Sequence, residues 1–318
     1  MQAQLDRKAR YERACLEANA SGCFYLSRMY ADGKGVPKDP EKSVQLSKQA
    51  CDLGLGEGCL QLGLIYGDKK QQVLAVEYYE KACTLDMSSG CLNAGVRYRD
   101  GIAGRIDIAK ALQLYKAGCD KLNDKYNCRE AGLLYRDGRG TARSLTTAHR
   151  YFRKACDLSY SWACHNMALA YSKGEGVPVN KARARQYHEK GCDLGDWKGC
   201  AALSSLLYDG AGGPADAKRG IELQKKGCGF NEPDACLLLG LTLRRGIRVP
   251  TNHRESMIYL KKACELKSAD GCFFVGANYQ FGDGVARDAG EAARYYRRTL
   301  AINPSDKDAK EALSKMGR

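Results

Sequence analysis

The stretch Tyr79-Glu80-Lys81-Ala82-Cys83 is followed after seven intervening residues by Cys91, and this arrangement of two cysteines occurs eight times in the chain. Seven cysteine pairs enclose seven residues and one encloses eight, and together they use all 16 cysteines. The first cysteines of successive pairs are 36, 32, 36, 37, 36, 36 and 36 residues apart. Such a period predicts a solenoid, in which each unit buries its apolar face against its neighbours. The pairs are Cys15 with Cys23, Cys51 with Cys59, Cys83 with Cys91, Cys119 with Cys128, Cys156 with Cys164, Cys192 with Cys200, Cys228 with Cys236 and Cys264 with Cys272.

Each unit is predicted to be a hairpin of two helices. In the first full unit the first helix is expected to open at Cys23 and to run to about Tyr30. A loop over residues 32–40 follows, whose glycines supply the positive φ angles that end a helix. The second helix then ends at Cys51. In the next unit the short stretch Gly67–Gln72 replaces this glycine loop.

The ends of the chain are predicted to differ from the repeats. The chain opens with a lone second helix, and it ends with a polar helix that caps the array. A repeat array has one continuous core, so we predict a single all-α domain over residues 1–318. It consists of a half-repeat helix (1–17), the repeats (18–302) and a capping helix (303–318).

The first helix of each unit carries an apolar residue three positions after its cysteine, usually a small residue four after and usually a tyrosine seven after. Leu62, Gly63 and Tyr66 are an example, and this spacing lies on one helical face. A glycine inside a helix costs about 1 kcal/mol against alanine, so its recurrence predicts a close approach of the second helix. The second helix repeats Ala-x3-Tyr-x3-Cys, as in Ala75 and Tyr79, and we interpret this stripe as core packing.

The cysteine spacing favours a disulfide within each pair. Each pair spans the turn from a second helix to the next first helix, where a Cα separation of about 5–6 Å is reachable. A closed loop of about nine residues is worth roughly 2–3 kcal/mol per bridge. Zinc is one alternative, but the four histidines have no ligand spacing. Redox catalysis is another, but it favours Cys-x-x-Cys, which the chain lacks. We expect no metal and no cofactor.

The net charge of +14 and the pI of about 9.0 permit acidic partners. The basic residues alternate with Asp and Glu on the second helices, as in Glu77–Lys81, which is typical of a solvated helix face. No aromatic-plus-Arg motif for nucleic acid occurs, and no run of 18 apolar residues occurs. We therefore expect a monomer without nucleic-acid partners and without a membrane span.

These motifs resemble those of Sel1-like repeat proteins. The motifs are Leu-Gly-x2-Tyr at Leu62–Tyr66, Gly-x-Gly-Val-Pro at Gly33–Pro37 and Gly174–Pro178, and Tyr-x-Lys-Ala-Cys. With the cysteine pairs, the chain is similar to the Helicobacter cysteine-rich proteins and to a mitochondrial intermembrane-space assembly factor. The resemblance covers residues 3–302. It implies a right-handed αα superhelix of about eight disulfide-linked repeats, with the first helices on the concave side and a role in protein or peptide binding.

A binding scaffold is the function that the pattern favours, with the ligand on the concave face. Positions two after the second cysteine of each pair face away from the packing stripe, and several carry amides that can donate to and accept from a peptide backbone. Basic side chains nearby favour an acidic protein or peptide. The candidate ligand-binding residues are Tyr25, Gln61, Asn93, Arg97, Arg129 and Asn166.

Two other functions follow from the resemblance. Some Helicobacter members are described as penicillin-binding proteins with slow β-lactamase activity, but Ser-x-x-Lys, Ser-Asp-Asn, Lys-Thr-Gly and Gly-x-Ser-x-Gly are all absent here. We therefore predict no enzyme and name no catalytic residue. The other function is that of an assembly factor for a metallo- or haem-protein.

Sixteen paired cysteines predict an oxidising compartment, either the periplasm or the secreted space. Residues 1–10 are polar and contain no apolar signal segment. Because the chain opens in the middle of a unit, we expect that a leader has been removed. Import into the mitochondrial intermembrane space without a leader is the alternative.

Overall fold

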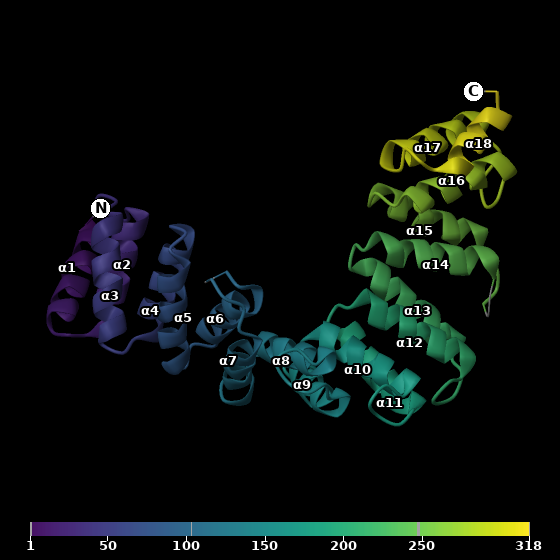
Figure 1. Ribbon diagram of the computed structural model, residues 1–318. Coiled ribbons are helices and arrows are strands. Elements are labelled where there is room, and N and C mark those ends of the chain that lie inside the picture. The colour runs from purple at the N-terminus through teal and green to yellow at the C-terminus, as the bar shows by residue number, and fades with distance from the viewer. Residues whose placement is uncertain (1, 103, 247–248, 318) are drawn as a thin grey trace. The chain divides into compact units, whose positions relative to one another are not determined.

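The computed structural model describes residues 2–102, 104–246 and 249–317, which form 18 helices and no strand (Figure 1). The all-α prediction is confirmed. The helices are α1 Gln2–Leu16, α2 Ala20–Asp32, α3 Pro40–Asp52, α4 Gly56–Asp68, α5 Gln72–Thr84, α6 Ser88–Asp100, α7 Ile108–Asp120, α8 Lys125–Asp137, α9 Leu145–Asp157, α10 Ser161–Lys173, α11 Lys181–Asp193, α12 Trp197–Asp209, α13 Ala217–Gly229, α14 Pro233–Arg245, α15 His253–Glu265, α16 Ala269–Phe281, α17 Ala289–Ile302 and α18 Lys307–Lys315.

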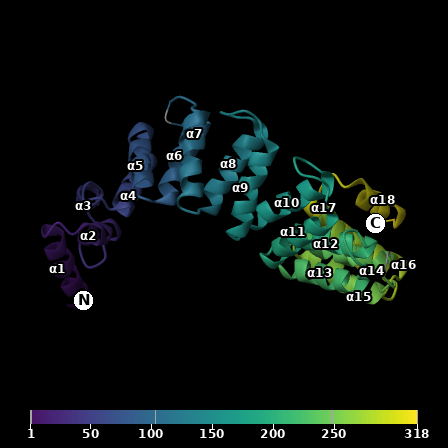
Figure 2. The same cartoon turned by 90° about the horizontal axis from the view of Figure 1, so that it is seen from below.

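The chain divides into two compact units, Met1–Leu158 with α1–α9 and Ser159–Arg318 with α10–α18, and each is described by itself. Within each unit every helix packs mainly against the helices before and after it in the chain (Figures 1 and 2). Even-numbered helices from α2 to α16 are the first helices of hairpins, and the odd-numbered helices that follow them are the second helices. The prediction of one domain over residues 1–318 stays a prediction.

Helix boundaries follow local capping chemistry. The first helices begin three residues before their cysteine rather than at it. The correction has a simple cause in α2, where the Asn19 side chain accepts from the Gly22 N–H and so caps the helix at Ala20. Seven first helices in the described residues end at a glycine with positive φ, as the loop glycines predicted. They end at Gly33, Gly101, Gly138, Gly174, Gly210, Gly246 and Gly282.

The short second unit departs from this rule and from the prediction. Gly67 and Asp68 belong to α4 instead of a loop, so the connection to α5 is only Lys69–Gln71. Lys70 takes the positive φ of +59° that a glycine adopts in the other units. The hairpin thus turns with three residues.

Disulfides join successive hairpins, and the predicted pairing is confirmed. Each bridge links the end of a second helix to the start of the next first helix, with Cα–Cα distances of 4.4–4.7 Å. These distances are shorter than the 5–6 Å expected from the sequence, because the turn brings the two helix ends close together. The bridges with these distances join Cys15 to Cys23, Cys51 to Cys59, Cys83 to Cys91, Cys119 to Cys128, Cys192 to Cys200, Cys228 to Cys236 and Cys264 to Cys272.

Cys156 and Cys164 are disulfide-bonded as well, and none of the 16 cysteines is free. All 16 are buried, including Cys59, Cys128, Cys236 and Cys272 at the starts of first helices. The cross-links therefore lie within the core and not on its surface.

Candidate functional site

Each hairpin is held together at one shared position, four residues after the cysteine of its first helix. A Cβ added to Gly63 would lie 2.6 Å from the Tyr79 ring, and one added to Gly132 would lie 2.5 Å from the Phe152 ring. Both aromatic side chains are at most 2% exposed. At these positions a glycine is required because an aromatic side chain of the second helix lies directly on it, and the predicted close approach of the second helix is confirmed.

In three hairpins this first-helix residue, the second-helix residue that lies on it, or both are polar. Gln224 Nε2 donates to Ser204 Oγ over 3.2 Å, and both residues are buried. The same backbone position thus serves apolar packing in some hairpins and polar chemistry in others. The pairs are Ser27 and Ser47 in α2–α3, Ala168 and His188 in α10–α11, and Ser204 and Gln224 in α12–α13.

Asn93 and Arg97 are brought together on α6. The Arg97 Nη1 donates to the Asn93 carbonyl over 3.2 Å, and its Nη2 donates to the Tyr79 hydroxyl over 3.5 Å. Its guanidinium carbon lies 4.5 Å from the centre of the Tyr79 ring, a cation–π geometry. Both candidate residues are half-buried, so the guanidinium is held in place at the surface of the first helices.

Gln61 and Tyr25 lie on the two first helices before α6. Gln61 is half-buried on α4, and its Oε1 accepts from Ser27 Oγ of α2 over 3.3 Å. Tyr25 is 46% exposed and stacks on Tyr11 of α1 with ring centres 5.3 Å apart. It also lines a small cavity between α1 and α2 together with Arg28.

Arg129 on α8 pairs with a buried carboxylate. Glu130 is 3% exposed and pairs with Arg129 and with Arg99 of α6, whose Nη1 lies 2.6 Å from Glu130 Oε2. Hydrogen bonding to Asp100 raises the Arg99 pKa further above its ordinary value, so that side chain stays charged. Arg99 and Arg129 are thus balanced by Glu130 and Asp100, so the buried carboxylate is fully paired.

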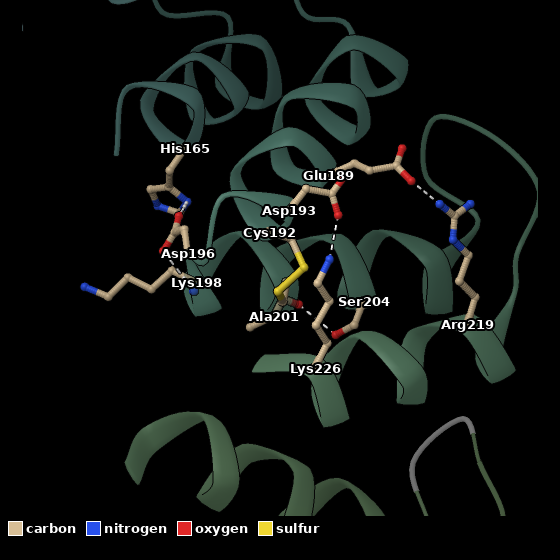
Figure 3. Close-up of a disulfide and its surroundings, with 11 residues drawn as sticks. His165, Glu189, Cys192, Asp193, Asp196, Lys198, Ala201, Ser204, Arg219 and Lys226 are labelled. Atoms are coloured by element: carbon tan, nitrogen blue, oxygen red, sulfur yellow. Dashed lines mark hydrogen bonds and ion pairs between the residues drawn. A yellow bond between two sulfur atoms is a disulfide. The ribbon is translucent and has the colours of Figure 1, made fainter. Parts of the chain in front are cut away.

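Asn166 lies on α10, in the second unit. Its Nδ2 donates to the Trp162 carbonyl of the same helix over 2.8 Å, and the side chain is half-buried. The preceding residue, His165, is tilted against His188 with ring centres 5.4 Å apart. Burial lowers the pKa of both histidines, and that of His188 falls to about 4. His165 faces Asp196, which opposes this shift (Figure 3).

Sequence reasoning missed a cavity between α12 and α14. Its volume is about 240 Å³, and Ser204, Tyr208 and Gln224 lie in its wall together with Leu238 and Arg245. Leu238 occupies the position two after a cysteine that the sequence had singled out as ligand-facing. A signal for the rest was available, because Gln224 stands where most other second helices carry an aromatic residue or leucine.

The outer side of these hairpins carries ion pairs between successive second helices. Lys226 Nζ lies 2.6 Å from Asp193 Oδ1, and Arg219 pairs with Glu189 (Figure 3). All four side chains are at least 40% exposed, so each pair contributes little to stability. The polar chemistry of this side is that of a solvated surface, as the charge alternation predicted.

Two other kinds of feature are absent from the part of the chain that the structure describes. The described residues contain no group of three or more His, Cys, Asp or Glu side chains that could hold a metal ion. Among the 18 described helices, none has the length and hydropathy of a membrane-spanning segment.

Known structures share the fold. A protective antigen of uropathogenic Escherichia coli with an SLR fold matches 97% of this chain and 67% of its own, at 23% identity and a TM-score of 0.77. A Sel1 repeat protein from Oxalobacter formigenes matches 97% of this chain and 89% of its own, at 20% identity and a TM-score of 0.74. Helicobacter pylori cysteine rich protein B covers 43% of this chain and 99% of its own, with 27% identity and a TM-score of 0.34.

Curated relatives match a short segment. Cytochrome c oxidase assembly factor 7A of Xenopus laevis is 40% identical over 57 residues, which is 18% of this chain. The match spans 25% of that relative's length, and the same holds for assembly factor 7 of Xenopus tropicalis at 39% identity.

Family models match most of the chain. The tetratricopeptide repeat model matches residues 56–87, the hairpin with the short turn. The Sel1 repeat model matches seven segments, residues 20–55, 88–121, 128–160, 163–196, 197–228, 233–268 and 269–300. Together with the helical hairpins, these matches show that the chain belongs to the Sel1 repeat family.

Proposed function

We propose that this chain is a non-enzymatic scaffold that binds an extended protein or peptide segment along its first helices. Sel1 and tetratricopeptide repeats form scaffolds consistent with protein–protein interaction, and the face and the kind of ligand are our proposal. The observation that carries it is the series of half-buried polar side chains on successive first helices. Gln61, Arg97 and Asn166 are each held by a neighbour, and their remaining donors and acceptors can bond a peptide.

Preorganisation supports this proposal. Ser27–Gln61 ties α2 to α4, and Arg99–Glu130 ties α6 to α8. Within the first unit, buried disulfides link successive hairpins, so the receptor loses little conformational entropy when a ligand binds. The Arg97 guanidinium, which is held by the uncharged Asn93 carbonyl and Tyr79 hydroxyl, favours an acidic segment in the first unit.

The test is a peptide-array or display screen against the oxidised 318-residue protein. Asn93→Ala combined with Asn166→Ala removes one first-helix amide from each unit, and we expect it to weaken captured peptides by about tenfold or more, at about 0.5–1.5 kcal/mol per lost hydrogen bond. Gln113→Ala combined with Gln186→Ala is the matched control, since it removes one exposed second-helix amide from each unit.

Two results would contradict the proposal, and they differ in whether the binding face or the binding function is wrong. If the asparagine variant and the control bind alike, the first-helix face is the wrong face. If the oxidised protein captures no peptide above background, the scaffold proposal itself is wrong.

An assembly factor for a metallo- or haem-protein is the second candidate. The segment similar to cytochrome c oxidase assembly factor 7A favours it, although it covers 18% of this chain. Direct handling of a cofactor predicts a new absorbance band when the oxidised protein is mixed with haemin or with copper. A scaffold that binds only the polypeptide of its client predicts spectra equal to the sum of the separate components.

Disulfides throughout the core indicate an oxidising compartment. Within that class we propose the periplasm or the secreted space, and the mitochondrial intermembrane space is the alternative that the assembly-factor similarity favours. Fractionation of the native host followed by thiol labelling tests this placement, because a reducing compartment predicts labelled cysteines.

A further inference from the structure

The cavity between α12 and α14 results from three departures from the repeat pattern. In five first helices of the chain a tyrosine stands seven residues after the cysteine and three before the end glycine, as Tyr135 does. In α12 the tyrosine is Tyr208, one position later. In α13 Gly220 replaces the usual alanine or serine, and a Cβ there would lie 2.6 Å from the Tyr208 ring. Gln224 is the third departure. Gln224 and Tyr208 line the cavity, and Gly220 lies against the Tyr208 ring.

Hydrogen bonding fixes the orientation of the Gln224 amide. Ser204 Oγ donates its only proton to the Ala201 carbonyl over 2.8 Å, so it can only accept from Gln224. Gln224 therefore directs Nε2 to Ser204, over 3.2 Å. Its Oε1 is left buried and has no hydrogen-bond partner among the described residues. The residue is 5% exposed, so this acceptor is almost completely withdrawn from bulk solvent.

The Tyr208 hydroxyl is a donor that lacks an acceptor among the described residues. It is also buried, and it too has no hydrogen-bond partner within the described part of the chain. Burial raises the Tyr208 pKa to about 12, so the hydroxyl stays protonated at neutral pH and can donate. A buried donor or acceptor without a partner is destabilising, and the two lie in the wall of one cavity.

We infer that this cavity is a binding slot for an amide group of a peptide ligand. One amide satisfies both orphaned groups, because its N–H donates to Gln224 Oε1 and its carbonyl accepts from the Tyr208 hydroxyl. Leu238 and Leu241 supply apolar walls for the adjoining carbon atoms. At about 240 Å³ the cavity is smaller than typical sites for drug-sized ligands, so it suits one residue of a chain.

The inference rests on the proposed peptide-binding function and names the chemistry of one subsite. The amide has two sources, a glutamine or asparagine side chain and the peptide main chain. Three probes separate them in titrations of the oxidised full-length protein followed by ¹H–¹⁵N NMR. N-acetyl-glutamine-N′-methylamide carries both kinds of amide, N-acetyl-leucine-N′-methylamide carries only main-chain amides, and methyl 3-methylbutanoate carries no N–H group.

We expect saturable shifts of the Gln224 side-chain signal with the glutamine probe and none with the ester. Equal binding of the leucine probe assigns the slot to main-chain amides, and weaker binding assigns it to a side-chain carboxamide. Tyr208→Phe should weaken binding about fivefold or more, since it removes one hydrogen bond. Gln224→Leu installs the residue that the chain itself uses at Leu260 and should also weaken binding. Tyr279→Phe, outside the cavity, is the control and should leave it unchanged.

The proposal is overturned if the ester binds as tightly as the amides, or if Tyr208→Phe and Gln224→Leu both leave binding intact. It is overturned as well if no probe binds, which is the result expected of a cavity that holds only water. Peptide capture that persists in any of these cases leaves the scaffold function standing. If the amide probes bind but no peptide is captured, the scaffold function is overturned and the amide-binding cavity still stands.

Discussion

Hairpins α8–α9 of the first unit and α12–α13 of the second share a backbone position and fill it differently. In the first, Phe152 lies on Gly132 and is 2% exposed. In the second, Ser204 and Gln224 form a hydrogen bond beside a cavity. One position is therefore used either for packing or for polar chemistry. Buried disulfides, in contrast, occur in both units.

The greatest loss of stability is expected at the packed position. Phe152→Ala should lower the free energy of unfolding of its hairpin by about 4 kcal/mol, because truncating a buried phenylalanine leaves a cavity. Gln224→Ala, at the same position in α13, should cost about 1 kcal/mol, the worth of its hydrogen bond. Native-state hydrogen exchange on α8–α9 and α12–α13 measures both. Equal losses would show that the two hairpins do not differ in the way their contacts indicate.

A pH titration tests another polar hairpin, α10–α11. His188 has a pKa of about 4 in the folded protein against 6.5 for an unperturbed histidine, because burial disfavours its charged form. Below pH 6.5 the unfolded chain binds a proton that the folded chain does not. Stability should therefore fall as the pH drops from about 6.5 toward 4, by about 3 kcal/mol in all.

His188→Gln should remove most of this pH dependence, as measured by denaturant titration from about pH 4 to pH 8. The lowered pKa of His165 and the charge of Asp196 remain in the variant and account for any residual slope. At neutral pH and above, wild type and variant should run parallel. A variant as steep as the wild type in the acidic range would show that the buried histidine is not the cause.

The disulfides should behave alike in the two units. Cys83→Ala with Cys91→Ala in the first, and Cys192→Ala with Cys200→Ala in the second, each open a loop with a sequence separation of eight residues. Each double change should cost about 2–3 kcal/mol, because the entropy lost from the unfolded chain depends on loop length. Denaturant midpoints measure this, and costs that differ by more than about 1 kcal/mol would show that packing around the bridge matters more than the loop.

The weakest effect concerns two tyrosine hydroxyls. Tyr151 in the first unit donates to Asp120 Oδ2 over 3.0 Å, so Tyr151→Phe should cost about 1–2 kcal/mol. The Tyr208 hydroxyl has no hydrogen-bond partner in the described residues, so Tyr208→Phe should lower stability by less than about 0.5 kcal/mol or raise it, because the change removes an unsatisfied buried group. Thermal unfolding of the two variants side by side is sufficient. A larger loss at Tyr208 would mean that its hydroxyl is already paired.

The repeated features of the fold were predictable because they recur in register. Eight copies of one pattern indicated the helical hairpins, the bridges between them and the approach of a second-helix side chain to Gly63. Helix starts were less predictable, because side-chain caps such as Asn19 decide them and not the cysteines. The turn of the short second unit was predicted wrongly for a similar reason. Lys70 adopts the positive φ that we expected only of glycine.

The candidate site was only partly predictable. Spacing placed Asn93 and Arg97 on a first helix, but it could not reveal that the arginine lies on Tyr79, which comes from a different hairpin. The cavity at Gln224 was visible as a departure from the repeat, yet its meaning depends on which atom of the amide is left without a partner. That follows from the hydrogen bond that Ser204 makes to Ala201, which spacing alone does not give.

Hydrogen–deuterium exchange of the oxidised protein, with and without a peptide selected by display, tests whether the first helices form the binding face. A scaffold that binds through this face predicts that saturating peptide slows exchange in even-numbered helices, including α12 and α14, and leaves the exposed sides of α11 and α13 unchanged. Protection confined to the second helices, or no protection by a peptide that binds, would contradict it.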